Sequence, residues 1–168
     1  MPFYLKESEF LPELDGLHSV LIVPCRFCPA ASQAVREEKP YIEFFRRLLK
    51  TEAYESFITT LRRRLDERGI MNAVFESKLL HQFVACMWTS ERRKELARTA
   101  AEFDSVLVLG CDAMVEAVTE SLESAGCRVI QGMEIEGLMN VLPTISFPLN
   151  IHLELKGVTP VGSRPAIQ

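Results

Sequence analysis

The sequence has no long hydrophobic run and no excess of basic residues. Its longest apolar stretches, such as residues 105–109, fall far short of the roughly 20 apolar residues that a membrane-spanning helix needs. Residues 1–16 lack the basic start and apolar run of a signal peptide. With 19 basic and 23 acidic residues, the net charge of −4 has the wrong sign for a protein that neutralises nucleic-acid phosphates. We therefore expect a cytoplasmic protein that binds neither membranes nor nucleic acids.

Several catalytic and nucleotide-binding motifs are also missing. The chain contains no P-loop, no G-x-G-x-x-G and no serine-centred nucleophile elbow, so hydrolase and nucleotide-binding functions lack their usual signatures. The three histidines, His18, His81 and His152, show no paired metal-ligand spacing. Only His81, which precedes Cys86 by five residues, is a candidate substitute ligand. Whether the protein is an enzyme stays open.

No repeat, low-complexity segment or Gly/Ser linker divides the 168 residues. A composition of 48% hydrophobic and 25% charged residues is typical of one globular domain. A domain of this length buries roughly 70% of its unfolded surface and needs no disulfide or structural metal to fold. We expect residues 1–168 to form one domain, with an N-terminal lead at 1–17 and an extended arm and tail at 141–168.

Short apolar runs alternate with segments of helical periodicity, which indicates βαβ units. The expected strands are 19–23, 71–75, 105–109 and 127–131, and the expected helices lie within 41–48, 54–65, 90–103 and 112–125. Right-handed crossovers place such strands in a mainly parallel sheet with helices on both faces. We expect a three-layer α/β fold with the flavodoxin-like strand order 2-1-3-4.

The last third of the chain departs from this alternation. Residues 132–140 are expected to form a methionine-rich loop that caps the sheet or covers a ligand. Residues 141–147 and 151–156 are extended runs interrupted by proline, and no helical pattern separates them. Because proline suits a sheet edge better than a sheet centre, we expect an antiparallel edge hairpin or an extended arm there.

Five cysteines are the most informative feature of the sequence. Disulfides are rare in the reducing cytoplasm, so metal binding, redox chemistry or simple burial remain as their roles. Cys25 and Cys28 follow the first expected strand, Cys86 lies after the second, and Cys111 follows the third. Because ligands bind at the carboxyl ends of such strands, we expect these four to meet in one crevice. Cys127 begins the fourth strand and is expected at the opposite edge.

Four cysteines arranged as C-x2-C and two singles can bind either an iron–sulfur cluster or a tetrahedral zinc ion. Structural zinc usually takes two close pairs, so one pair and two singles favour a cluster, expected to be 4Fe–4S. One alternative is a thiol–disulfide oxidoreductase that uses Cys25 and Cys28, because a helix N-terminus can lower a thiol pKa. Another is a non-catalytic small-ligand-binding module with no cofactor, in which the cysteines are merely buried.

The residues at two expected strand ends resemble those of a known family. These are VPCRFC at residues 23–28 and LGC at residues 109–111. Over about residues 20–141, the chain resembles the small iron–sulfur partner subunits of methylenetetrahydrofolate reductase complexes, the MetV type. The resemblance implies electron transfer or assembly within a one-carbon enzyme complex. We therefore expect a redox or accessory subunit whose partner is a larger redox or methyl-transfer enzyme subunit, a second copy of the chain, or both.

Overall fold

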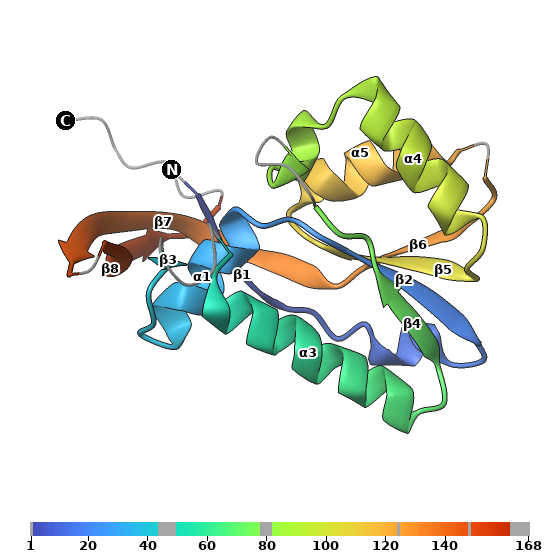
Figure 1. Ribbon diagram of the computed structural model, residues 1–168, viewed down its shortest axis with the longest axis horizontal. Coiled ribbons are helices and arrows are strands. Elements are labelled where there is room, and N and C mark those ends of the chain that lie inside the picture. The colour runs from blue at the N-terminus through green and yellow to red at the C-terminus, as the bar shows by residue number, and fades with distance from the viewer. Residues whose placement is uncertain (1, 44–49, 78–81, 124, 148, 162–168) are drawn as a thin grey trace.

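The structure is a computed structural model that describes residues 2–43, 50–77, 82–123, 125–147 and 149–161. Its strands and helices form two sheets and the helices packed on them (Figure 1). The strands are β1 Phe3–Glu7, β2 Ser19–Pro24, β3 Ile42–Glu43, β4 Met71–Val74, β5 Ser105–Leu109, β6 Arg128–Gln131, β7 Met133–Ser146 and β8 Asn150–Thr159. The helices are α1 Cys28–Arg36, α3 Glu52–Glu67, α4 Ser90–Ala100 and α5 Asp112–Leu122, with short 3-10 turns η1 Leu11–Leu14 and η3 Ala85–Met87.

The first sheet is parallel, with the strand order β4-β2-β5-β6. Every residue of β2 and β5 is buried, because these mainly apolar runs, rich in Val, Leu and Ile, lie at the centre of the sheet with both faces covered. Figure 1 shows α4 and α5 on one side of this sheet and α3 on the other. The predicted α/β class with a parallel sheet is confirmed, and its four strands are the four that the sequence indicates.

The second sheet is antiparallel, with the order β1-β7-β8-β3. It corrects two predictions, because β1 lies within the expected lead and residues 132–140 are mostly strand. Residues 133–138 alternate between covered and exposed positions, and this two-residue period buries one face of β7. The runs at 141–147 and 151–156 lie in or beside β7 and β8, which form a hairpin.

The helices agree with the sequence pattern except in two regions, because α1 is not among the expected helices and residues 41–43 are not helical. Residues 41–43 were expected at the start of a helix, but Ile42 and Glu43 instead pair with the beginning of β8. The rest of that expected helix, residues 44–49, lies outside the described residues. After α3 and α5 the chain turns at Gly69 and Gly126, whose φ angles of +73° and +62° suit glycine. Within the described residues, no helix is long and apolar enough to span a membrane.

Gly132 joins the two sheets. Its N–H donates to the carbonyl of Val108 in β5 at 2.9 Å, and its carbonyl accepts from Ser8 N–H, just after β1, at 3.1 Å. A Cβ at this position would lie 2.8 Å from Leu109 Cδ2 and 3.0 Å from Leu107 Cδ1. Glycine therefore allows the chain to cross tightly over β5 and to enter the second sheet.

Candidate functional site

Four cysteines lie beyond the carboxyl ends of the parallel strands. Cys25 follows β2, Cys28 is the first residue of α1, Cys86 lies in η3 after β4, and Cys111 is the N-cap of α5 after β5. The backbone N–H of Cys25 donates to the carbonyl of Leu109 at 2.9 Å, which ties the end of β2 to the end of β5. Cys25 and Cys111 are buried, Cys28 is half-buried and Cys86 is exposed. We call this region the cysteine crevice.

The four thiols are close enough to influence one another electrostatically. Burial raises the pKa of Cys25 to about 11, and the neighbouring Cys28 and Cys111 act in the same direction. Burial also raises the pKa of Cys28, and both Cys111 and Cys86 add to that effect. Cys25, Cys28 and Cys111 therefore lie near one another, and Cys86 lies near Cys28.

Backbone groups surround the two sulfur atoms of the C-x2-C pair. Hydrogen bonds with the backbone of Ala85 and Phe27 oppose the effect of burial and lower the pKa of Cys25. The backbone of Phe3 does the same for the pKa of Cys28. In addition, α1 and α5 begin at Cys28 and next to Cys111, and a helix N-terminus carries a partial positive charge. Once a metal replaces the thiol protons, these backbone groups and helix N-termini stabilise the negative charge on the sulfur atoms.

In the described part of the chain, no three Cys, His, Asp or Glu side chains are grouped so that they could hold one metal ion. Thiolates on a tetrahedral zinc lie about 3.8 Å apart, because each Zn–S bond is about 2.3 Å long. The thiolates of an iron–sulfur cluster bind different iron atoms and lie further apart. Four thiols, two of them with backbone hydrogen bonds to sulfur, are a donor set that such a cluster takes. His81, the candidate substitute ligand, lies outside the described residues.

Cys127 lies apart from the crevice. It precedes β6, and its thiol donates to the carbonyl of Phe103, which precedes β5, at 3.5 Å. It therefore sits at the amino ends of the strands, the edge where the sequence places it. Burial raises the pKa of Cys127, with a contribution from Asp104 but none from another cysteine. Cys127 is thus a natural control for experiments on the other four.

Aromatic side chains hold the segment that carries Cys86. The ring of Phe75, just after β4, meets Trp88 edge-on at 5.6 Å between centroids. The guanidinium of Arg92, in α4, lies over Phe75 at 3.8 Å and over Trp88 at 5.5 Å. Trp88 also donates its indole N–H to the carbonyl of Gln82 at 2.7 Å. Trp88 therefore anchors the turn beside the crevice, although nothing in the sequence distinguishes it from an ordinary core residue.

Two tyrosines near the crevice were also not predicted from the sequence to lie beside the candidate site. Tyr54 of α3 is fully buried, and its hydroxyl donates to the carbonyl of Leu109 at 3.3 Å. Burial raises its pKa far above 10, and Cys25 adds to the effect. Burial raises the pKa of Tyr41 to about 12, with further contributions from Cys28 and Cys25. Both tyrosines match apolar helical patterns in the sequence, so no local signal separates them from core residues.

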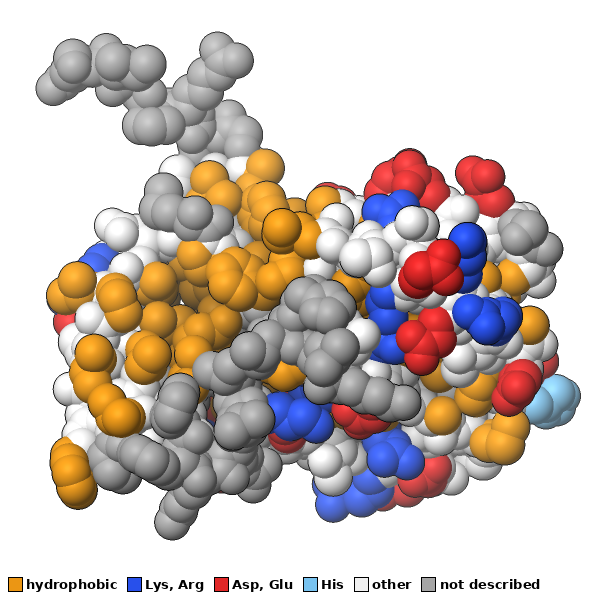
Figure 2. Space-filling view, turned by 45° about the horizontal axis from the view of Figure 1, so that its top comes forward, with side chains coloured by type: hydrophobic (Ala, Val, Ile, Leu, Met, Phe, Trp, Pro, Cys, Tyr) orange, Lys and Arg blue, Asp and Glu red, His pale blue; other side chains and the backbone are white. Residues whose placement is uncertain are grey.

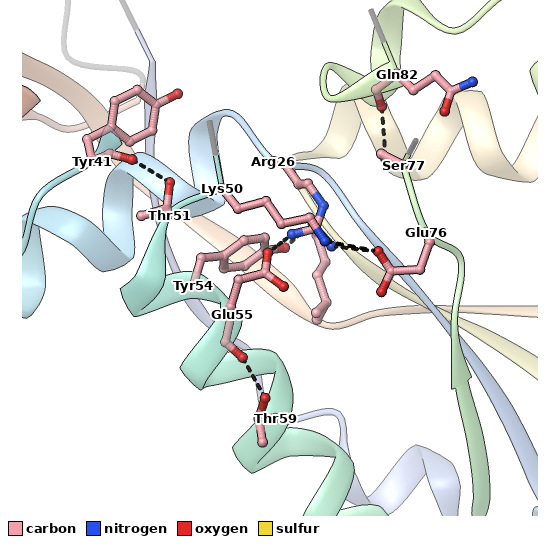
Figure 3. A network of polar contacts seen from close by, with 11 residues as sticks. Arg26, Tyr41, Lys50, Thr51, Tyr54, Glu55, Thr59, Glu76, Ser77 and Gln82 are labelled. Atoms are coloured by element: carbon pink, nitrogen blue, oxygen red, sulfur yellow. Dashed lines mark hydrogen bonds and ion pairs between the residues drawn. The ribbon is translucent and has the colours of Figure 1, made fainter. Parts of the chain in front are cut away.

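A buried cation stands between the cysteines of the C-x2-C pair. The side chain of Arg26 is only 2% exposed, and it forms ion pairs with Glu55 of α3 and with Glu76 after β4 (Figure 3). The Glu76 contact measures 3.3 Å, and Lys50 lies 3.5 Å from the same carboxylate. The sequence does not predict this network, because its members come from three separate segments.

Comparisons of the chain with protein-family models, with curated proteins and with solved structures found no match. The geometry of the cysteine crevice is therefore the basis for assigning a function.

Proposed function

We propose that Cys25, Cys28, Cys86 and Cys111 bind an iron–sulfur cluster of the 4Fe–4S type. The proposal is supported by the position of four cysteines beyond the carboxyl ends of one parallel sheet, with backbone hydrogen bonds at two of the sulfur atoms. The crevice lies between β2 and β5, where the proposed flavodoxin-like order reverses and ligands bind. When bound, a cluster would supply one-electron transfer. The chain's own residues would exclude water from it and donate hydrogen bonds to its ligands.

The protein would then act in the cytoplasm as a redox or accessory subunit of one-carbon or methyl-transfer metabolism. This part of the proposal rests on the resemblance to MetV-type subunits at residues 23–28 and 109–111. Its partner would be a larger redox or methyl-transfer enzyme subunit, a second copy of the chain, or both. Such a partner would be the source and the destination of any electron that passes through the crevice.

The β7–β8 hairpin offers a surface for such a partner. Its register places Val141 opposite Leu155, Pro143 opposite Leu153 and Ile145 opposite Ile151, so one face of the hairpin is entirely apolar there. Figure 2 shows hydrophobic side chains gathered at this end of the molecule. The exposed members of this hydrophobic end include Leu142, Ile145, Phe147, Leu149 and Leu155. Apolar surface of this kind commonly marks an interaction site.

The thiol–disulfide alternative has less support from the geometry. The attacking cysteine of such enzymes needs a lowered pKa, because the thiolate is the nucleophile. Burial instead raises the pKa of both Cys25 and Cys28, which keeps them protonated near neutral pH. A zinc site and a small-ligand-binding module remain as further outcomes of the test.

The test is purification and reconstitution of the protein without oxygen, followed by iron, sulfide and zinc analysis. We expect a brown protein with stoichiometric iron and sulfide. Replacement of Cys25, Cys28, Cys86 or Cys111 by serine should each lower the iron content sharply, because a hydroxyl is a poor substitute for a thiolate. Cys127→Ser is the matched control and should keep the iron content of the wild type.

Three outcomes would overturn the proposal of an iron–sulfur cluster. Stoichiometric zinc in a colourless protein would identify a metal site of another kind. A metal-free protein with a reversible Cys25–Cys28 disulfide would place it in the thiol redox class. If neither metal nor disulfide is found, the crevice would belong to a non-catalytic ligand-binding module.

A further inference from the structure

The buried charge of Arg26 needs an explanation, because it is costly to remove a charge from water. Its side chain is 2% exposed and paired with two carboxylates, Glu55 and Glu76, whose side chains are 21% and 52% exposed. A buried ion pair is often no more stabilising than apolar residues of similar volume, so its presence points to a specific arrangement of the chain. Figure 3 shows the guanidinium between the two carboxylates, which come from different elements.

Arg26 lies among the segments that form the cysteine crevice. Its backbone N–H donates to the carbonyl of Phe83 at 2.9 Å, and the same carbonyl accepts the thiol of Cys25 at 3.6 Å. Phe83 begins the short stretch that supplies the backbone hydrogen bond of Ala85 to Cys25 and then reaches Cys86. The side chain of Arg26 therefore contacts α3 and the end of β4, while its backbone N–H contacts the stretch before η3.

We propose that Arg26 is the positioning residue of the cysteine crevice: its side chain holds the Cys25–Cys28 loop against α3 and the end of β4, and so keeps Cys25 beside the stretch that leads to Cys86 before any metal binds. This inference rests on the proposed function for its purpose, but its geometric content concerns the metal-free protein. Arginine suits the task because its planar guanidinium can engage two carboxylates at once. The single ammonium of lysine offers no such fork.

The experiment compares Arg26→Gln with Arg64→Gln. Arg64 pairs with Glu7 at 2.5 Å and also links α3 to another element, but at a partly exposed site away from the cysteines. The first measurement is the alkylation rate of each cysteine in the metal-free, reduced protein, followed by mass spectrometry. The second is the iron and sulfide content after reconstitution of the cluster without oxygen.

We expect Arg26→Gln to speed alkylation of Cys25 by about tenfold or more through local opening, while the rate at Cys127 stays unchanged. We expect it to lower the iron and sulfide content severalfold at limiting iron, because replacing a residue that orients metal ligands usually weakens metal binding by about 10- to 100-fold. Arg64→Gln should change neither quantity. Equal acceleration at Cys25 and Cys127 would indicate general destabilisation and would overturn the proposal, as would unchanged alkylation at Cys25.

A second variant covers the case in which Arg26→Gln does not fold. Removing Arg26 alone leaves Glu55 unpaired, whereas the double variant Arg26→Met with Glu55→Met replaces the pair by apolar side chains. This variant still lacks the link to Glu76, so we expect the same selective opening at Cys25. If the wild type binds no cluster while Cys25 still opens selectively, the proposed function fails and the positioning role of Arg26 stands.

Discussion

Burial of Cys25 predicts that the folded protein loses stability above about pH 9. Its thiol is 5% exposed, and burial raises the pKa from 9.0 to about 11. Between these values the folded protein keeps a proton that the unfolded chain releases, so the free energy of unfolding falls as the pH rises. Each pKa unit corresponds to about 1.36 kcal/mol, and two units give about 2.7 kcal/mol. This stabilisation is fully present below about pH 9 and is lost as the pH rises through about 11.

The assay is urea unfolding of the metal-free, reduced protein at about pH 8, 9, 10 and 11, for the wild type and Cys25→Ala. Tyr41 and Cys28 also have raised pKa values, so both proteins should weaken at high pH. The difference in unfolding free energy between them isolates Cys25 and should shrink by about 2 kcal/mol by pH 11. A difference that stays constant over this range would refute a buried, protonated thiol at this position.

Two further predictions concern the junction between the sheets and the hairpin. Gly132→Ala should lower the free energy of unfolding by about 1–3 kcal/mol in urea, because its Cβ would lie 2.8 Å from Leu109 Cδ2. Gly157→Ala, which meets no described atom within 4 Å, should change it much less. Ile145→Asp, at a side chain that is 73% exposed, should leave the melting temperature unchanged but weaken any self-association in sedimentation velocity. Unaltered association would exclude the hairpin face as the contact between copies.

The parallel sheet and, as one of two alternatives, the β7–β8 hairpin could be predicted from the sequence, but the pairing of β1 and β3 with that hairpin could not. A central strand such as β5, buried on both faces, appears as a continuous apolar run that needs no knowledge of its neighbours. By contrast, β1 is a strand because it pairs with β7, more than 120 residues later in the chain. Ile42 and Glu43 likewise follow their pairing with β8 against a helical pattern of aromatic residues. Pairing partners far apart in sequence leave no local signal.

The same distinction applies to the site. The cysteines could be placed at one edge because each follows a strand or lies in a crossover, and topology then brings them together. The burial of Arg26 could not be predicted, because it depends on Glu55 and Glu76 reaching it from two other elements. An arginine next to cysteine in the sequence is far more often exposed.

The raised thiol pKa values and the buried Arg26 together indicate the order in which the site would form. Four thiolates in a half-buried crevice would repel one another, but the raised pKa values of Cys25 and Cys28 keep those two thiols neutral in the folded, metal-free protein near neutral pH. Arg26 pairs with its own carboxylates and does not need the cysteines as partners. Under the proposed function, a metal or cluster would displace protons from these thiols, so its affinity should rise with pH. Folding would then precede loading of the site.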